Sequence, residues 1–255
     1  MLDPIFVFGA FRLPVYSLML TLALVIALAL SFRRAPYCRA QIIDTGIGAL
    51  FGAVIGARLE YVALSWDYFA LHMDEITRWD AGGLGWHGAV IGGLVGVWLI
   101  GRWRGVDPHW LLARFAWVIP LVMLSAWIGC AAAGCGYGRE VDTLANYPDW
   151  LVWESRDVYG NFVPRFSTAR FGVIVGLVTA GIGLLARGER RFWLMLAVVS
   201  AGMFAIGFVR ADASPMIAGL RVDQVLDALM FVWAVQRTLT TENTESTEKM
   251  TRDRV

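Results

Sequence analysis

Residues 42–64 read IIDTGIGALFGAVIGARLEYVAL, an apolar stretch of the length that a membrane-spanning helix needs. Gly48, Gly52 and Gly56 recur every four residues within it, and small residues at that spacing let two helix backbones approach closely in lipid. The composition points the same way, because 58% of the 255 residues are hydrophobic and only 17% are charged. The stretch therefore predicts a tightly packed helix of a membrane protein.

Six further segments are predicted to cross a bilayer. Each approaches the roughly 20 mostly apolar residues that one crossing takes. They are residues 16–32, 84–100, 111–132, 168–186, 192–209 and 225–240. The last is the weakest, because Asp223 and Asp227 lie at its start and its apolar length is short. We therefore expect an all-α polytopic membrane protein of about seven transmembrane helices.

Basic residues alternate between the connections of these segments. The connections after the first, third, fifth and seventh segments hold Arg33, Arg34, Arg39, Arg102, Arg104, Arg114, Arg187, Arg190, Arg191, Arg237, Lys249, Arg252 and Arg254. The connection between the second and third segments instead has Asp67, Asp74, Glu75 and Asp80 against Arg78 alone. Since cytoplasmic loops carry the excess of lysine and arginine, the N-terminus is predicted outside and the C-terminus in the cytoplasm.

One large domain is expected. Residues 1–240 form the transmembrane domain, and residues 137–165 are its longest and most polar connection. This connection contains Trp150 and Trp153, which favours a small extracytoplasmic head at the outer interface. Residues 241–255 have almost no apolar side chains and are predicted to be a disordered cytoplasmic tail.

The three cysteines, Cys38, Cys130 and Cys135, show neither a CxxC nor a Cys/His metal spacing, so no metal site or cofactor is expected. They do not form a disulfide framework of the secreted kind. We interpret Cys130 and Cys135 as small apolar packing residues, with a reactive thiol as the alternative. Binding to nucleic acid is not expected either, because the basic residues are dispersed among the loops.

Ionisable residues inside or at the edges of the predicted spans are candidates for function, since inserting each one costs about 2.5–3.5 kcal/mol. With the predicted orientation, these residues all lie in the outer half of the bilayer, level with Tyr16: Arg58, Glu60, His87, Arg170, Arg210 and Asp227. Several arginines and one histidine at headgroup depth suit a phospholipid phosphate and a proton transfer.

Each of these residues also has a structural interpretation. Arg58 and Glu60 are two apart and cannot share a helix face, so each needs a partner on another helix and could form an ion pair there. His87 could be a neutral histidine bonded to a carbonyl, and Arg210 could anchor a helix end at the headgroups. Asp227 most simply caps or pairs near the start of the last helix.

Six motifs spread over most of the chain share a pattern with one known family. They are LPVYSLML at 13–20 with FRRA at 32–35, GARLEYV at 56–62, RWDAGGLGWHGAVIGG at 78–93, VIPLVMLSAWIGCAAAGCGYGREVD at 118–142, VPRFSTARF at 163–171 and GFVRADA at 207–213. Together they resemble the prolipoprotein diacylglyceryl transferases, most specifically at the segment that holds His87 and Gly88.

The resemblance implies an enzyme that moves the diacylglyceryl group of phosphatidylglycerol to the thiol of a lipobox cysteine, with release of glycerol 1-phosphate. The implied partners are the phospholipid donor, the preprolipoprotein acceptor and the cytoplasmic (inner) membrane of a bacterium, on its outer side. The resemblance and the polar residues together predict catalytic and substrate-binding groups. These are His87 and Tyr16 for catalysis, and Arg58, Gly88, Gly138, Arg139, Arg170 and Arg210 for binding the substrate.

The chain departs from the family pattern at several polar positions. Trp127 and Met203 stand where the family has arginines, Cys130 where it has an asparagine, and Gly207 where it has a glutamate. The remaining arginines are the candidate replacements. Two alternatives stay open: a related membrane lipid transferase with another acceptor or donor, and a non-catalytic lipid-binding or transport protein on the same scaffold.

Overall fold

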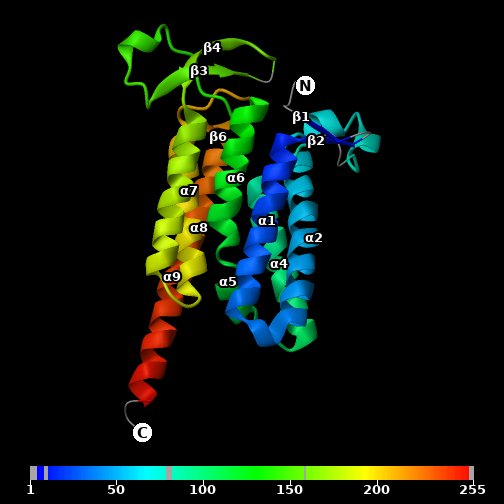
Figure 1. Ribbon diagram of the computed structural model, residues 1–255, viewed down its shortest axis with the longest axis vertical. Helices are drawn as coiled ribbons and strands as arrows, with labels where there is room; N and C mark the ends of the chain where they lie inside the picture. Colours follow the sequence, from blue (N-terminus) through cyan, green and yellow to red (C-terminus); the bar gives the residue numbers. More distant parts are fainter. Residues whose placement is uncertain (1–4, 9–10, 79–81, 158, 253–255) are drawn as a thin grey trace. The chain divides into compact units, whose positions relative to one another are not determined.

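The computed structural model describes residues 5–8, 11–78, 82–157 and 159–252, and it is mostly helical, as predicted (Figure 1). Asp80 and Arg254, which entered the predicted orientation, lie outside these ranges. The chain divides into two compact units. One unit contains residues 28–115, and the other contains residues 1–27 and 116–255.

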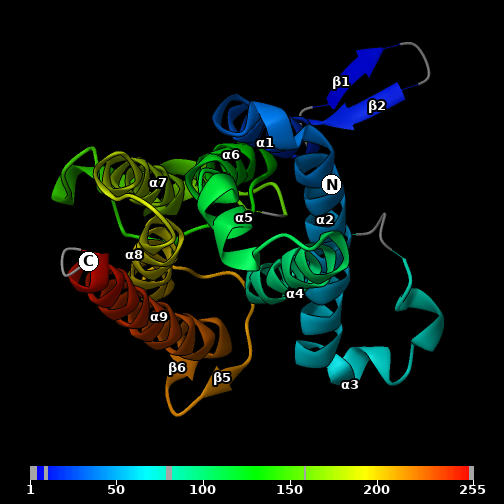
Figure 2. The same ribbon diagram turned by 90° about the horizontal axis from the view of Figure 1, so that it is seen from below.

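The 28–115 unit is built around two long helices. Its elements are the end of α1 (Val15–Arg34), η1 (Pro36–Cys38), α2 (Arg39–Leu64), α3 (Trp66–Phe69), η2 (Met73–Glu75), α4 (Trp86–Arg104) and α5 (Pro108–Phe115). Helices α2 and α4 lie side by side along most of their length, as Figures 1 and 2 both show. An ion pair between Arg104 and Asp44 joins them where α4 ends.

The contact between α2 and α4 depends on glycine. A Cβ added at Gly52 would overlap the carbonyl oxygen of Gly92, and one added at Gly56 would overlap that of Gly88. A Cβ added at Gly96 would likewise overlap the carbonyl oxygen of Gly48, whereas one added at Gly48 would overlap the Ile100 side chain. The close packing predicted from the four-residue glycine spacing is therefore confirmed, because only helices without side chains along this line can approach so closely.

The described part of the second unit contains a helical bundle and three short hairpins. Its elements are β1 (Ile5–Phe8), β2 (Phe11–Pro14), the first part of α1, α6 (Val118–Ala133), η3 (Leu144–Asn146), β3 (Val152–Arg156), β4 (Phe162–Phe166), α7 (Thr168–Leu185), α8 (Arg190–Gly207), β5 (Met216–Ile217), β6 (Leu220–Arg221) and α9 (Val222–Arg252). Helices α6, α7, α8 and α9 pack successively, with Trp193, Met195 and Leu196 of α8 in the core.

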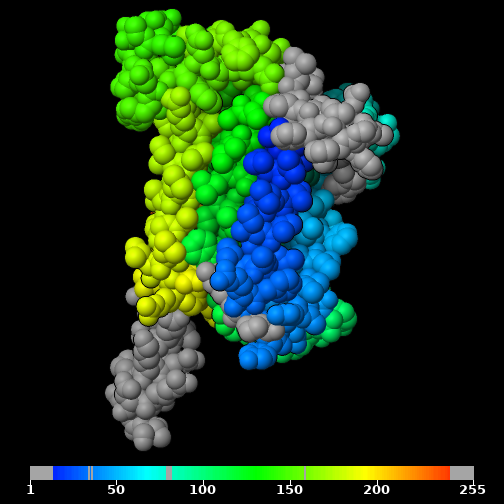
Figure 3. All heavy atoms as spheres, viewed as in Figure 1, coloured from blue at the N-terminus to red at the C-terminus, as the bar shows by residue number. Residues whose placement is uncertain are grey.

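Each pair of strands is antiparallel, from β1 with β2 to β5 with β6. None of these strands is predicted from the sequence, since strands of two to five residues carry too little alternation of apolar and polar residues to detect. The β3–β4 hairpin lies in the predicted head at residues 137–165, except for its last residue, Phe166. In Figure 3 the atoms of this hairpin, in green, cover the end at which α7 begins.

Among the described residues, four helices are long and apolar enough to cross a membrane by themselves: α1 over Val15–Arg33, α2, α7 and α8. Helices α5 and α6 give a fifth candidate if this pair, bent by 42°, is one span. The predicted spans at 84–100 and 225–240 coincide with α4 and α9, which do not meet the same test of length and composition. The polytopic class is thus supported, and the count of seven spans stays a prediction.

Large apolar side chains cover the exposed faces of these helices. On α2, Phe51 is 67% exposed and Leu59 is 63% exposed. Contiguous exposed apolar surface is unusual in a protein surrounded by water and is the normal condition of a helix surrounded by lipid. At the C-terminal end, α9 continues to Arg252, and the disordered tail predicted for 241–255 stays a prediction.

We expect alanine to destabilise the α2–α4 contact at Gly92 but not at the adjacent Gly93. Gly92→Ala places a methyl group against the carbonyl oxygen of Gly52, whereas a Cβ at Gly93 meets only ordinary contacts with Ala49 and Ala53. Gly92→Ala should therefore lower the free energy of unfolding by about 1–3 kcal/mol. Gly93→Ala, which gains the same helix propensity, should not.

Thermal unfolding of both variants in the same detergent checks this prediction. Equal destabilisation by the two substitutions would show that the glycine contact does not form as described.

Candidate functional site

His87 is buried at the beginning of α4 and is bonded to a carboxylate. The helix begins at Trp86, and the His87 side chain is 5% exposed. Its Nδ1 lies 2.8 Å from Oε1 of Glu60, which comes from the last part of α2. The partner of His87 Nδ1 is therefore a carboxylate on the neighbouring helix.

Glu60 also satisfies the backbone at the start of α4. Its Oε2 accepts a hydrogen bond of 2.6 Å from the backbone N–H of Gly88. The first N–H groups of a helix have no partner within the helix, and Gly85, the residue before α4, has no side chain that caps them. A carboxylate from another helix performs this role, and its negative charge is favourable at a helix N-terminus.

Arg58 precedes Glu60 by two residues in α2 and is buried, and its guanidinium group is occupied by backbone carbonyls. Its Nε donates to Ile76 (2.8 Å), Nη1 donates to Gly82 (2.8 Å) and Gly83 (3.2 Å), and Nη2 donates to Glu75 (2.7 Å). The guanidinium also lies over the rings of Tyr61 and Phe69. Arg58 thus ties the segment before α4 to the end of α2. This arrangement favours a positioning role over direct binding of a phosphate.

A hollow of about 210 Å³ lies next to Arg58. A hydrogen bond from the Tyr68 hydroxyl to Glu75 Oε2, 2.7 Å long, raises the pKa of Tyr68. The lining residues are Arg58, Tyr61, Tyr68, Phe69, Glu75, Arg78 and Gly82. The hollow combines aromatic walls with charged groups that already bond to one another.

Gly138, Arg139 and Arg210 meet in the other unit. Gly138 pairs with Arg210 in an antiparallel bridge, and the Arg139 N–H donates to the Val209 carbonyl at 2.8 Å. A Cβ at Gly138 would overlap the Phe166 carbonyl, so this position accepts only glycine without rearrangement. The Arg139 side chain is exposed and donates to the Phe208 carbonyl.

Arg210 is neutralised by acidic groups of its own unit. Its guanidinium lies 2.5 Å from Asp212 and 3.7 Å from Asp223, and Arg221 bonds to the same two carboxylates. Burial alone would raise the pKa of Asp223. Hydrogen bonds from Ser214 and Arg221, together with the charges of both arginines, instead hold that pKa below its ordinary value. This network fixes the segment before α9.

The remaining predicted residues also lie in this unit. Arg170 is exposed at the start of α7, where it donates to the Asp149 carbonyl and lies 4.9 Å from the ring centre of Trp153. Tyr16 packs against Gly129 of α6, whose Cα hydrogen faces the tyrosine. Each of the four predicted arginines thus contacts protein groups of its own unit.

Trp127 and Met203, which stand where the resemblance implies arginines, are part of the core. Trp127 is 5% exposed, and its indole occupies the space left by Gly172 of α7, where a Cβ would overlap the ring. Met203 is also buried, in α8. These two positions therefore contribute to packing between helices.

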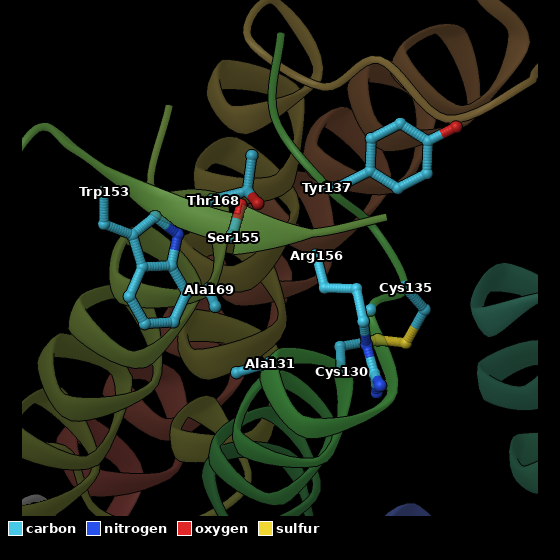
Figure 4. A pocket seen from close by; sticks show the side chains of 10 residues that line it. Cys130, Ala131, Cys135, Tyr137, Trp153, Ser155, Arg156, Thr168 and Ala169 are labelled. Carbon is cyan, nitrogen blue, oxygen red and sulfur yellow. A yellow bond between two sulfur atoms is a disulfide. The ribbon is translucent and has the colours of Figure 1, made fainter. Parts of the chain in front are cut away.

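Cys130 and Cys135 form a disulfide, which corrects their interpretation as separate packing residues or reactive thiols. Gly134 ends α6 with a φ of +74°, and this left-handed turn brings the two cysteine Cα atoms within 4.7 Å. Figure 4 shows the disulfide beside Arg156, whose Nη2 donates to the Ala132 carbonyl at 2.9 Å. The cavity beside the disulfide has a volume of about 10 Å³, which is enough for a single water molecule.

Glu60 is the site residue that is not among the catalytic and substrate-binding residues predicted from the sequence. Its position inside a predicted span makes it a candidate for function, with an ion pair to another helix as the structural interpretation. Its position in the sequence indicates that it has a partner, because an acid in a membrane helix needs one nearby. The identity of that partner depends on the register of α2 against α4, which the sequence spacing alone does not fix.

Comparison with known proteins gives consistent matches over nearly the whole chain. A family model described as prolipoprotein diacylglyceryl transferase matches residues 4–239. The phosphatidylglycerol–prolipoprotein diacylglyceryl transferase of Streptococcus uberis is 28% identical over 250 residues, which are 92% of this chain and 93% of that protein. The protein of the same name from Symbiobacterium thermophilum is 32% identical over 193 residues, which are 70% of this chain and 69% of that protein.

The disulfide predicts a specific pattern of thiol labelling. Without a reductant, denatured protein should incorporate one alkylating group, at Cys38, and after reduction it should incorporate three. Mass spectrometry of the intact protein counts the groups, and peptide mapping locates them. Labelling of Cys130 or Cys135 before reduction would contradict the bond.

Proposed function

Because this chain belongs to the prolipoprotein diacylglyceryl transferase family, we propose that it moves the diacylglyceryl group of phosphatidylglycerol to the thiol of a lipobox cysteine in a preprolipoprotein. Glycerol 1-phosphate is the second product. The observation that best supports this proposal is the buried His87 with its Nδ1 held by Glu60. Imidazole is the side chain that most readily exchanges a proton near neutral pH, and a thiol must lose its proton to attack.

The proposed transfer is a single displacement. His87 accepts the thiol proton. The thiolate sulfur then attacks the carbon of the diacylglyceryl group that is bonded to the phosphate oxygen. A sulfur–carbon bond forms as the carbon–oxygen bond breaks, and the electron pair of that bond leaves with glycerol 1-phosphate. The proton on His87 then passes to solvent. In this scheme Tyr16 is assigned the role of a hydroxyl donor to the substrate.

Phosphate binding is assigned mainly to Arg139 and Arg170, whose side chains are exposed. Guanidinium groups hold phosphate oxygens through two parallel hydrogen bonds and stabilise the charge that develops on the leaving group. Gly88 and Gly138 contribute backbone that a substrate can approach closely. Arg58 and Arg210 support the site indirectly, because carbonyls hold the first and two aspartates hold the second.

The protein is a multi-pass membrane protein, and we propose seven spans with the N-terminus outside and the C-terminus in the cytoplasm of a bacterial cell. The distribution of basic loops supports this orientation. The Cys130–Cys135 disulfide supports it as well, since disulfides persist on the oxidising side of the inner membrane. In this orientation the β3–β4 hairpin belongs to an outer head.

A second candidate function has one observation in its favour. Trp127 and Met203 fill core positions where the family pattern has arginines. The phosphate of the usual donor then loses two expected contacts, which favours a related lipid transferase with another donor or acceptor, or a lipid-binding protein on the same scaffold. Lipid analysis of cells with and without the protein distinguishes these functions from the first one.

Replacing His87 tests the proposed function directly. His87→Gln should lower the rate of thioether formation by about 100-fold or more, because the thiol loses its general base. The assay uses purified protein in vesicles that contain phosphatidylglycerol, with a lipobox peptide as acceptor and mass spectrometry of the product. His72→Gln is the matched control, since His72 is exposed and stacks on Tyr68.

Two results would contradict the proposed function. The first is the absence of any diacylglyceryl thioether from the wild-type protein under conditions in which an established family member forms it. The second is a wild-type rate for His87→Gln.

A further inference from the structure

Glu60 is a buried carboxylate to which the transfer scheme above assigns no role. It lies in the last part of α2, its side chain is 11% exposed, and both of its oxygens have partners on α4. Oε1 lies 2.8 Å from His87 Nδ1, and Oε2 accepts the Gly88 N–H at 2.6 Å. Burying a carboxylate is costly unless it is paired and hydrogen-bonded, so these two contacts are what make its position tolerable.

Two glycines at the start of α4 make the space that this carboxylate occupies. A Cβ added at Gly85 would overlap the Glu60 carboxylate itself, and one added at Gly88 would lie 2.8 Å from the Glu60 Cβ. The carboxylate is therefore enclosed by backbone on one side and by the imidazole on the other. With both oxygens bonded, rotation about its last bond would break two hydrogen bonds at once.

This geometry selects one form of the imidazole. The Gly88 N–H can only donate, so Oε2 must accept, and the ionised carboxylate has only acceptors to offer to His87. Nδ1 of His87 therefore carries a proton, and the lone pair of the neutral ring lies on Nε2. When Nε2 takes up a second proton, the adjacent negative charge stabilises the imidazolium that forms.

We propose that Glu60 is a positioning residue for His87: it fixes the Nδ1–H tautomer and stabilises the imidazolium formed when the acceptor thiol gives up its proton. This inference rests on the proposed function of His87 as the base. Glu60 touches neither the thiol nor the phospholipid in this scheme, and it acts through the ring alone. The proton balance is unchanged, since the thiol proton resides on Nε2 and Glu60 stays ionised throughout.

A purely structural role for Glu60 makes different predictions. The Arg104–Asp44 ion pair joins the same two helices, and its side chains are 40% and 26% exposed. Asp44 contacts no histidine in the described ranges. Asp44→Asn therefore removes a carboxylate cross-link between α2 and α4 without changing His87, and it is the matched control for Glu60→Gln.

Glu60→Gln offers one acceptor and one donor to two partners that both need an acceptor. The Gly88 N–H cannot change its protonation state, whereas the imidazole can move its proton to Nε2. The substitution should therefore turn the nitrogen of the introduced amide toward Nδ1 and remove the lone pair from Nε2. We expect the kcat of thioether formation to fall by about 100-fold or more, with little change in the KM for phosphatidylglycerol. Asp44→Asn should retain the wild-type kcat.

The tautomer is measured separately by nitrogen NMR of protein labelled with ¹⁵N-histidine, which contains only three histidines. His87 is assigned by its absence from the His87→Gln spectrum. The wild-type ring should show a protonated Nδ1, and the Glu60→Gln ring should show a protonated Nε2. A wild-type kcat for Glu60→Gln would overturn the inference, and so would a lost kcat with the tautomer unchanged.

The failure of the proposed function has a different signature. If His87→Gln keeps its activity, or if the wild-type protein forms no thioether, then the base assignment fails whatever the NMR spectrum shows. If His87→Gln is inactive and Glu60→Gln is not, the proposed function stands and the role of Glu60 falls.

Discussion

The line of glycines between α2 and α4 is the constraint on which the His87 site depends. Gly52 against Gly92 and Gly56 against Gly88 leave no room for side chains, so the two backbones lie in direct contact. In lipid, close approach of this kind replaces the hydrophobic force that joins helices in water. It also brings the end of α2 within reach of the N-terminus of α4. A carboxylate on one helix can then bond an imidazole and a backbone N–H on the other.

The guanidinium groups of Arg58 and Arg210 are bonded to other groups of the protein. Arg58 gives four hydrogen bonds to backbone carbonyls, and Arg210 shares two aspartates with Arg221. Such arginines order loops, because several donors on one rigid plane hold several segments together. The exposed guanidinium groups of Arg139 and Arg170 are better suited to meet a phosphate that enters from the membrane surface. The division of the arginines into these two classes is a property of the fold.

The sequence predicted the helical class, the α2–α4 glycine contact and the placement of His87 at the start of a helix, because these depend on composition, period and the cost of a polar group in lipid. It did not predict the Cys130–Cys135 disulfide, since a five-residue separation closes only when Gly134 adopts a left-handed turn. The partner of Glu60 was missed for a related reason. Which α4 atoms face Glu60 is decided by the register between two helices that meet across a long connection, from Leu64 to Trp86.

The proposed His87 site depends on the hydrogen bond between Glu60 and His87 across the glycine contact. Its most direct measurement is the dipolar coupling between the carboxyl carbon of Glu60 and Nδ1 of His87, in protein labelled with ¹³C-glutamate and ¹⁵N-histidine in lipid bilayers. A measurable coupling that disappears in Glu60→Gln and in His87→Gln is the predicted result, because the carboxyl oxygen lies 2.8 Å from the nitrogen. A wild-type spectrum without that coupling would mean that α2 and α4 do not meet in the described register.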